Sequence, residues 1–235
     1  MKYKSRAIAL TYIKHSESSI ISRIFTEEKG LQSFIVKGVR SKKNKKKISY
    51  FEPLRLLSIN AKFNAKNSLQ YLEDVSIIDG FGLTKNKMHK NFIAFFIAEI
   101  GSKVLQENDP NKMLFDFIWE TSASLYKTEN ISSNFALKYL LNLSKFLGFY
   151  PSKIEITKPF FNLENGCFSE EKGVSKIILG KQRSAYLKAL INNQPITIPK
   201  NERSKLLKDL LRYYKLHHYN LDGITSHIII ESLNQ

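Results

Sequence analysis

The sequence predicts an α+β protein in which a small N-terminal barrel is followed by a mainly α-helical domain. Two observations lead to this fold class. Five segments rich in β-branched and aromatic residues lie between residues 6 and 78, which is typical of short strands. Beyond Asp79-Gly80 the apolar residues recur at the spacing of a helix face. We therefore expect a barrel domain over residues 1–80 and a helical domain over residues 81–235.

The predicted strands are joined by short turns, except for one long connection between the third and the fourth. They cover Arg6–Lys14, Ser19–Thr26, Leu31–Lys37, Leu54–Phe63 and Leu69–Ile78. Five short strands favour a closed barrel, and the five-stranded OB-fold is the small barrel that most often binds single-stranded nucleic acid. An SH3-like barrel has a similar number of strands and stays an alternative.

The long connection carries the most concentrated charge in the chain. Seven of the eleven residues from Lys37 to Lys47 are cationic, and no Asp or Glu occurs between Glu28 and Glu52. A basic loop held at both ends by a sheet predicts contact with a polyanion such as nucleic acid. A solubilising loop or a disordered basic tract is the alternative. The predicted DNA-binding residues are Lys37, Arg40, Lys42, Lys43, Lys45, Lys46 and Lys47, continued by Arg55, Lys62 and Lys66.

The overall charge is +16 in 235 residues, and most of it lies near the N-terminus. Residues 1–80 hold 16 Lys/Arg against 7 Asp/Glu, whereas residues 81–150 hold 8 against 6 and residues 151–235 hold 13 against 8. This distribution indicates a basic binding module attached to a more neutral body. The single cysteine, Cys167, excludes an intramolecular disulfide and fits a reducing cytoplasm. No apolar run is long enough to span a bilayer, so we expect no membrane association.

Three helices are expected in the first part of the helical domain. The first presents Met88, Phe92, Phe96, Ile100 and Val104 on one face. The second is expected to begin with Asp109 as its cap and Pro110 at its first position, and the third runs from Ser132-Ser133 to Leu147-Gly148. We interpret their aromatic stripes as core rather than as a cofactor pocket.

The C-terminal part predicts a hairpin followed by more helices. Asn165-Gly166 suits a tight turn between two strands that together cover Phe160 to Ser169. The further helices are expected over Arg183–Asn193, Glu202–His218 and Ile224–Leu233. In the second of these, the inward side chains are expected to be Leu206, Leu207, Leu210, Leu211 and Tyr214, and the outward cations Lys205, Lys208, Arg212 and Lys215. The outward face is a solvated surface or a second phosphate-contacting surface.

No catalytic set is evident in the sequence. There is no Gly-rich phosphate loop ending in Lys-Ser/Thr and no Gly-x-Ser-x-Gly elbow. Glu73-Asp74 is the only adjacent Glu-Asp pair, His217-His218 lies on a basic helix, and Cys167 has no evident His partner. We therefore expect a binding protein rather than an enzyme, without a cofactor or a metal site.

Several motifs in a fixed order resemble the RecO family, a family of bacterial DNA-repair and recombination mediator proteins. The N-terminal motifs are Arg6-Ala7-Ile8-Ala9-Leu10, Glu17-Ser18-Ser19-Ile20-Ile21, Phe25-Thr26-Glu27-Glu28-Lys29-Gly30 and Val36-Lys37-Gly38-Val39-Arg40. Leu147-Gly148-Phe149-Tyr150-Pro151 is similar to the family's Leu-Gly-x-x-Pro. Leu210-Leu211-Arg212-Tyr213-Tyr214 with His217-His218 is similar to its Leu-Arg-x-Tyr-x-x-His pattern.

The resemblance implies an OB-fold followed by a helical domain, and a cytoplasmic, nucleoid-associated protein. It implies binding of single- and double-stranded DNA and annealing of complementary strands. It also implies partnership with RecR and with the acidic C-terminal tail of single-strand-binding protein, which leads indirectly to RecA loading. Many family members carry four cysteines in a small zinc module after the Leu-Gly-x-x-Pro motif. Here that region retains only Cys167, so we expect a zinc-less hairpin insertion near residues 158–178, held by apolar packing.

Three classes of function follow from these observations. A DNA-binding mediator without enzymatic activity is favoured, with Phe34, Tyr50 and Phe51 as residues that either stack on bases or fill the barrel core. An RNA-binding or ribosome-associated basic OB-fold protein has the same features. A nuclease would need a cluster of carboxylates that holds metal ions, which the sequence does not show. The acidic tail is expected to dock on the helices between Phe92 and Phe146, beside Lys103, Lys112, Lys138 and Lys145.

Overall fold

The computed structural model describes residues 1–39, 48–78, 88–170 and 177–227. These residues belong to two compact units, Met1–Ile131 and Ser132–Gln235. In the described ranges, the first unit contains a barrel and two α-helices, and the second contains three α-helices and a hairpin. The compact unit that contains the barrel extends past residue 80, to Ile131. The domain boundary expected at residue 80 stays a prediction. No helix in the described ranges is long and apolar enough to cross a membrane.

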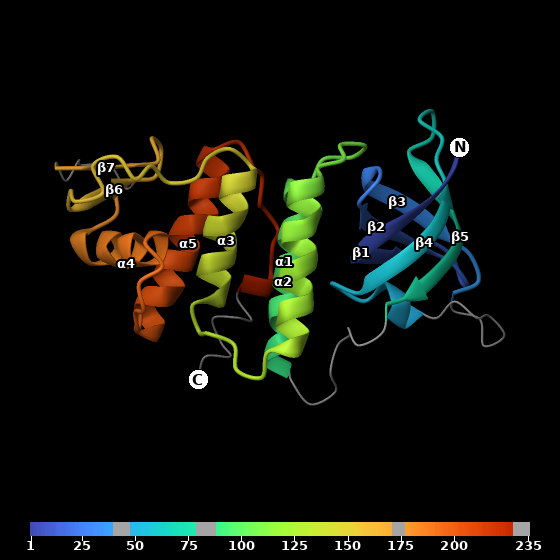
Figure 1. The fold of residues 1–235 in the computed structure, drawn as a ribbon, viewed down its shortest axis with the longest axis horizontal. Helices are drawn as coiled ribbons and strands as arrows, with labels where there is room; N and C mark the ends of the chain where they lie inside the picture. Colours follow the sequence, from blue (N-terminus) through green and yellow to red (C-terminus); the bar gives the residue numbers. More distant parts are fainter. Residues whose placement is uncertain (40–47, 79–87, 171–176, 228–235) are drawn as a thin grey trace. The chain divides into compact units, whose positions relative to one another are not determined.

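Five strands close the barrel in the order β1-β2-β3-β5-β4, so the predicted OB-type barrel is confirmed (Figure 1). The strands are β1 Lys2–Lys14, β2 Ile20–Thr26, β3 Gly30–Val36, β4 Leu56–Lys62 and β5 Leu69–Ile77. Strand β1 pairs antiparallel with β2 and with β4, and its register with β2 shifts between Ala9 and Thr11. A parallel pairing of β3 with β5 completes the closure.

The barrel interior is filled by alternate residues of the strands. Its core includes Ala7, Ala9, Ile20, Ile24, Phe34, Val36, Phe51, Leu57, Ile59 and Ala61, each with at most 1% of its surface exposed. Phe51 comes from the short 3-10 helix η1, Ile48–Phe51, which precedes β4. Residues that alternate with these point to the outer face, because successive side chains of a strand lie on opposite faces of the sheet.

Helices α1, Met88–Val104, and α2, Lys112–Lys127, belong to the same unit as the barrel, and α1 packs against β1 (Figure 1). The predicted inward face of α1 is correct for Phe96, Ile100 and Val104, which are buried. Met88 was predicted to face inward and does not: it is the first helical residue and is 65% exposed. Lys90 is buried instead, and its ammonium donates to the carbonyls of Tyr126 and Thr128 at the end of α2.

The predicted start of α2 is wrong by two residues. The helix begins at Lys112, and the side chain of Asn111 caps it by accepting from the backbone N–H of Leu114 at 3.0 Å. The preceding residues are held against β3, because Asn108 N–H donates to the carbonyl of Leu31 at 3.2 Å. Gly30 permits this approach, since a Cβ there would lie 2.3 Å from the carbonyl oxygen of Asp109.

In the second unit, α3 covers Phe135–Phe146, α4 Lys181–Ile191 and α5 Lys200–Leu216. Helix α3 begins later than predicted: Ser132 instead forms a turn in which its carbonyl accepts from the N–H of Phe135. Its predicted end is confirmed, with Leu147 as the C-cap and Gly148 at φ +85°. On α5 the predicted cations are exposed, but Tyr213 is buried and Leu211 is only half-buried. Most of the helix predicted over Ile224–Leu233 lies outside the described residues.

The predicted hairpin is confirmed as strands β6, Phe160–Asn162, and β7, Cys167–Ser169, with Gly166 at φ +66°. Its inner side is apolar: Phe161, Leu163 and Phe168 are each at most 2% exposed. The ring of Phe161 lies 5.0 Å from that of Phe168 and 5.8 Å from that of Tyr213 on α5. Aromatic packing therefore holds the hairpin to the helices, as expected from the sequence.

Candidate nucleic-acid interface

The outer face of the barrel carries cross-strand rows of side chains, and the first row is covered by helix α2. Ile8 pairs with Phe25, and Phe25 pairs with Leu31. All three residues are at most 1% exposed. The ring of Phe25 lies 5.4 Å from that of Phe115 on α2. This row serves to attach the helices.

The second row is polar and is tied to the end of α1. It consists of Thr11, Arg23 and Ser33, which are cross-strand neighbours. The Arg23 guanidinium donates to the carbonyl of Ser102 at 2.8 Å, and the Ser33 hydroxyl donates to the Glu107 carboxylate at 3.4 Å. The Arg23 side chain is thus bonded within the unit, and we do not count it among the phosphate-binding residues.

The third row is apolar and open to solvent. Ile13 pairs with Ile21, Ile21 with Ile35, and Ile35 with Tyr71. Ile13 is 64% exposed and Tyr71 is 52% exposed, while Ile21 and Ile35 are half-buried. We call Ile13, Ile21, Ile35 and Tyr71 the apolar row. An exposed apolar patch on a strongly charged protein is a feature of binding surfaces.

Two predicted DNA-binding lysines lie beside the apolar row. The Lys37 ammonium lies 5.7 Å from the centroid of the Tyr71 ring, within the range of a cation–π interaction. Lys62 is the cross-strand partner of Tyr71 on β4, and its ammonium is 2.9 Å from the carboxylate of Glu73. The Glu73 carboxylate also pairs with Lys2, and these contacts lower its pKa. The site therefore combines exposed cations with an aromatic face.

The remaining predicted contacts are less closely grouped. Lys66 is exposed in the turn between β4 and β5. Arg55 has a side chain only 15% exposed, which donates to Glu52 at 2.7 Å and to the carbonyl of Ser49 at 3.2 Å. Six predicted residues lie outside the described part of the chain: Arg40, Lys42, Lys43, Lys45, Lys46 and Lys47.

The aromatic residues weighed as stacking candidates belong to the core. Phe34 and Phe51 are fully buried in the barrel, and Tyr50 packs against the same cluster. In the described part of the barrel, the exposed aromatic beside the apolar row is Tyr71, which the sequence reasoning did not single out. Its position in an alternating strand, between buried Gln70 and Leu72, was the signal that could have identified it as outward-facing.

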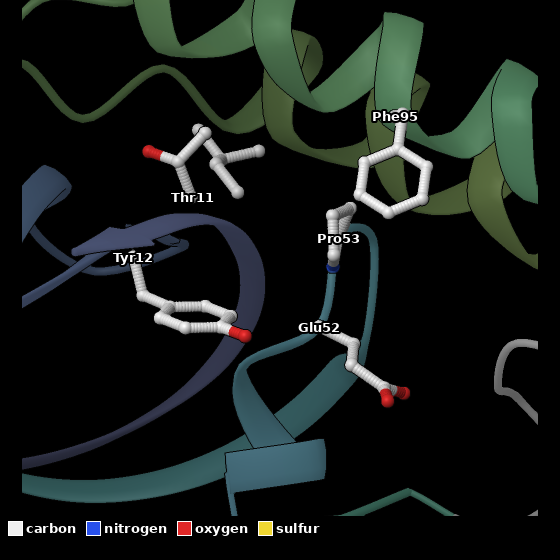
Figure 2. A pocket seen from close by; sticks show the side chains of 6 residues that line it. Thr11, Tyr12, Glu52, Pro53 and Phe95 are labelled. Atoms are coloured by element: carbon white, nitrogen blue, oxygen red, sulfur yellow. The ribbon is translucent and has the colours of Figure 1, made fainter. Parts of the chain in front are cut away.

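A pocket of about 460 Å³ lies beside β1 and α1 in the first unit. Figure 2 shows Tyr12, Pro53 and Phe95 around it, with Glu52 at its edge. The Glu52 carboxylate is already paired with Arg55, and the other lining residues, Leu10 and Thr11, supply no ionisable group. The described lining therefore offers an apolar hollow and no nucleophile with a general base.

No metal site is formed in the described ranges, where no three His, Cys, Asp or Glu side chains come together. The ring of His217 stacks on Phe149 at 4.9 Å, and burial lowers its pKa. Cys167 lies at the start of β7, where its thiol contacts the carbonyl of Asn165. His217 is thus engaged in ring stacking, and Cys167 in a hydrogen bond with the backbone.

Comparison with known proteins agrees with this architecture along the chain. The family model for the N-terminal part of recombination protein O matches residues 1–81, and the model for its C-terminal part matches residues 86–222. The chain belongs to the RecO family. Residues 1–81 carry the barrel and the apolar row, so both lie in the N-terminal family region.

Curated relatives of the RecO family match over nearly the full length. "DNA repair protein RecO" of Flavobacterium psychrophilum is 34% identical, covering 100% of this chain and 99% of that protein. The protein of the same name from Azobacteroides pseudotrichonymphae is 29% identical over 99% of both chains. That from Flavobacterium johnsoniae is 32% identical over 95% of this chain and 94% of its own. The likeness therefore extends through both units.

Proposed function

We propose that this chain acts in DNA repair as a DNA-binding recombination mediator, by binding rather than by catalysis. The observation that carries the proposal is the apolar row on a five-stranded barrel, with Lys37 and Lys62 beside it. A cationic surface with an exposed aromatic residue suits single-stranded nucleic acid. Membership of a family whose relatives are named as DNA repair proteins supports DNA as the ligand.

The proposed activity is the annealing of complementary strands, which needs no bond chemistry. Two single strands repel each other through their phosphates, so a cationic surface that screens both lets their bases meet. Base pairing then supplies the driving force. Phosphates are present in single and double strands alike, so the lysines would bind both.

The proposed partners are RecR and the acidic tail of single-strand-binding protein, with RecA loaded as the result. The four lysines expected around the tail are divided between the two compact units: Lys103 and Lys112 in the first, Lys138 and Lys145 in the second. Lys112 is already paired with Glu27 and Asp116. The tail is therefore proposed to use the lysines of one unit, beside apolar residues of its helices.

The tail proposal is tested on the full chain with a fluorescent tail peptide. Lys103→Glu and Lys145→Glu change one exposed lysine in each unit. Weaker peptide binding by one variant alone places the tail on that unit. Unchanged binding by both variants would mean that the tail binds elsewhere than on these helices.

We propose that the mediator activity takes place in the cytoplasm, at the nucleoid.

Competition between DNA and RNA tests the proposed ligand directly. A labelled single-stranded DNA is bound to the chain and displaced by unlabelled DNA or RNA of the same sequence. We expect DNA to be at least as effective a competitor as RNA. A marked preference for RNA would instead support a ribosome-associated role. Magnesium-dependent cleavage of either strand would show an enzyme.

A further inference from the structure

The apolar row is continuous across four strands of the barrel. Its members are consecutive cross-strand partners from β1 to β5. Neighbouring strands lie about 4.8 Å apart, so the row extends over roughly 14 Å. That length can accept a few nucleotides that lie across the strands.

The contrast with the first row indicates that the apolar row has another purpose than packing. Ile8, Phe25 and Leu31 have the same cross-strand arrangement and are fully covered in the first unit. In the described part of the chain, Ile13 and Tyr71 keep more than half of their surface exposed. Leaving such side chains in water carries no folding benefit.

The charges around the row favour a ligand that is apolar in one part and anionic in another. Lys37 lies over the Tyr71 ring, and Lys62, which stays 56% exposed although it is paired with Glu73, is opposite Tyr71 on β4. A single strand has this chemistry, because its bases have π-faces and its backbone has phosphates. In a duplex the bases are stacked inside, and only phosphates and groove edges are accessible.

We propose that the apolar row is a base-stacking subsite that distinguishes single strands from duplex. Ile13, Ile21, Ile35 and Tyr71 contact unpaired bases, and Lys37 and Lys62 contact the adjacent phosphates. When the bound strand pairs with its complement, its bases leave the row, and the duplex keeps only the phosphate contacts. The row thereby favours release of the annealed product. This inference rests on the proposed function.

The test compares single- and double-stranded DNA affinity for Tyr71→Ala in the full chain. Removal of one stacking ring should weaken single-strand binding by roughly 5- to 100-fold. Duplex affinity should stay within about twofold. Tyr71→Phe keeps the ring and should bind like the original chain. Ile154→Ala, at a residue 76% exposed in the second unit, is the matched surface control.

A second measurement reports stacking without truncating the side chain. Trp119→Phe removes the single tryptophan, and Tyr71→Trp then places the fluorophore in the row. Quenching by oligothymidylate but not by duplex is expected. Met113→Trp in the same background, at a residue 74% exposed on α2, should not be quenched.

The possible failures are distinguishable. If the original chain binds single strands and Tyr71→Ala binds them equally well, the subsite is refuted while the proposed function stands. Equal decreases in affinity for single strands and duplex would also refute it. If Ile13→Lys converts a dimer into a monomer, the row is an interface between two copies instead. A chain that binds no DNA would refute the proposed function and the subsite together.

Discussion

The guanidinium of Arg6 lies 2.9 Å from the carboxylate of Asp116, although 110 residues separate them in the sequence. The same guanidinium donates two hydrogen bonds to Glu27 and lies over the rings of Phe115 and Trp119. These contacts join β1 to α2 with charge-assisted and cation–π interactions. They explain why the compact unit extends to residue 131, whereas the N-terminal family model ends at residue 81.

Glu27→Gln should destabilise the chain at neutral pH. Hydrogen bonds from Arg6, helped by Lys112, lower the pKa of Glu27 from 4.5 to about 2. The ionised carboxylate therefore stabilises the fold above pH 4.5, and this contribution disappears as the pH falls toward 2. Because the group is partly solvated, we expect a decrease of about 1 to 2 kcal/mol in the free energy of unfolding.

Urea unfolding at several pH values measures this contribution. The free energies of the original chain and Glu27→Gln should differ most near neutral pH and converge near pH 2. Glu164→Gln, at an exposed glutamate in the hairpin turn, is the control. A difference that stays constant between pH 7 and pH 2 would contradict the role assigned to the Glu27 charge.

Gly166→Ala should cost more stability than Gly148→Ala. Both glycines have positive φ, +66° and +85°, so both substitutions strain the backbone. Only at Gly166 would the new Cβ also meet a neighbour, 2.8 Å from the Tyr213 hydroxyl. That hydroxyl is held by its hydrogen bond to the Phe149 carbonyl at 2.6 Å.

Thermal and urea unfolding should therefore show a destabilisation of about 1 kcal/mol for Gly148→Ala and roughly 2 to 4 kcal/mol for Gly166→Ala. If the two variants lost the same free energy of unfolding, the hairpin would be able to move away from α5 without a loss of stability. In that case Tyr213 would not be the residue that holds the hairpin.

The hairpin should be stable without zinc. Phe161, Leu163 and Phe168 fill its inner side, and the single cysteine cannot build a multi-thiolate site. Elemental analysis of the purified chain should find no stoichiometric zinc, and a chelator should leave Tm unchanged. One equivalent of zinc per chain, with a lower Tm after chelation, would show that the apolar interpretation is wrong.

Alanine at Lys42, Lys43, Lys45, Lys46 and Lys47 should weaken DNA binding with little dependence on base sequence. For single strands, the slope of log K against log salt should flatten by about 0.7 for each phosphate that the loop no longer neutralises. The control replaces as many exposed lysines elsewhere: Lys103, Lys127, Lys145, Lys153 and Lys181. An unchanged slope for the loop variant would mean that the loop lysines are only solvated and do not contact phosphates. A flatter slope for the control would reveal a further DNA-binding surface.

Local sequence patterns predicted most of the fold because they reflect local physics. The β-branched and aromatic residues of the strand predicted over Ser19–Thr26 and the Asn165-Gly166 turn each depend on a few neighbouring residues, and both elements formed as expected. The start of α2 was not predictable in this way. Asp109-Pro110 is a good local helix start, but contacts of Asn108 with β3 hold that segment outside the helix.

Only the charged residues of the candidate site could be predicted from the sequence. Lys37 and Lys62 could be chosen from composition, whereas the role of Tyr71 depends on the parallel pairing of β3 with β5, which places it beside Ile35. The pairing register of two strands that are distant in the chain cannot be predicted from the local sequence of either strand. Arg55 shows the reverse: its charge suggested a phosphate contact, but the structure pairs it with Glu52 and leaves only 15% of its side chain exposed.

Annealing of complementary strands coated with single-strand-binding protein tests the central claim most directly. Two coated strands are mixed, and duplex formation is followed by fluorescence with and without the chain. We predict that the chain accelerates duplex formation, and that the five-lysine loop variant and Tyr71→Ala each reduce the acceleration. If the chain binds DNA but leaves the annealing rate of coated strands unchanged, the proposed mediator function is contradicted.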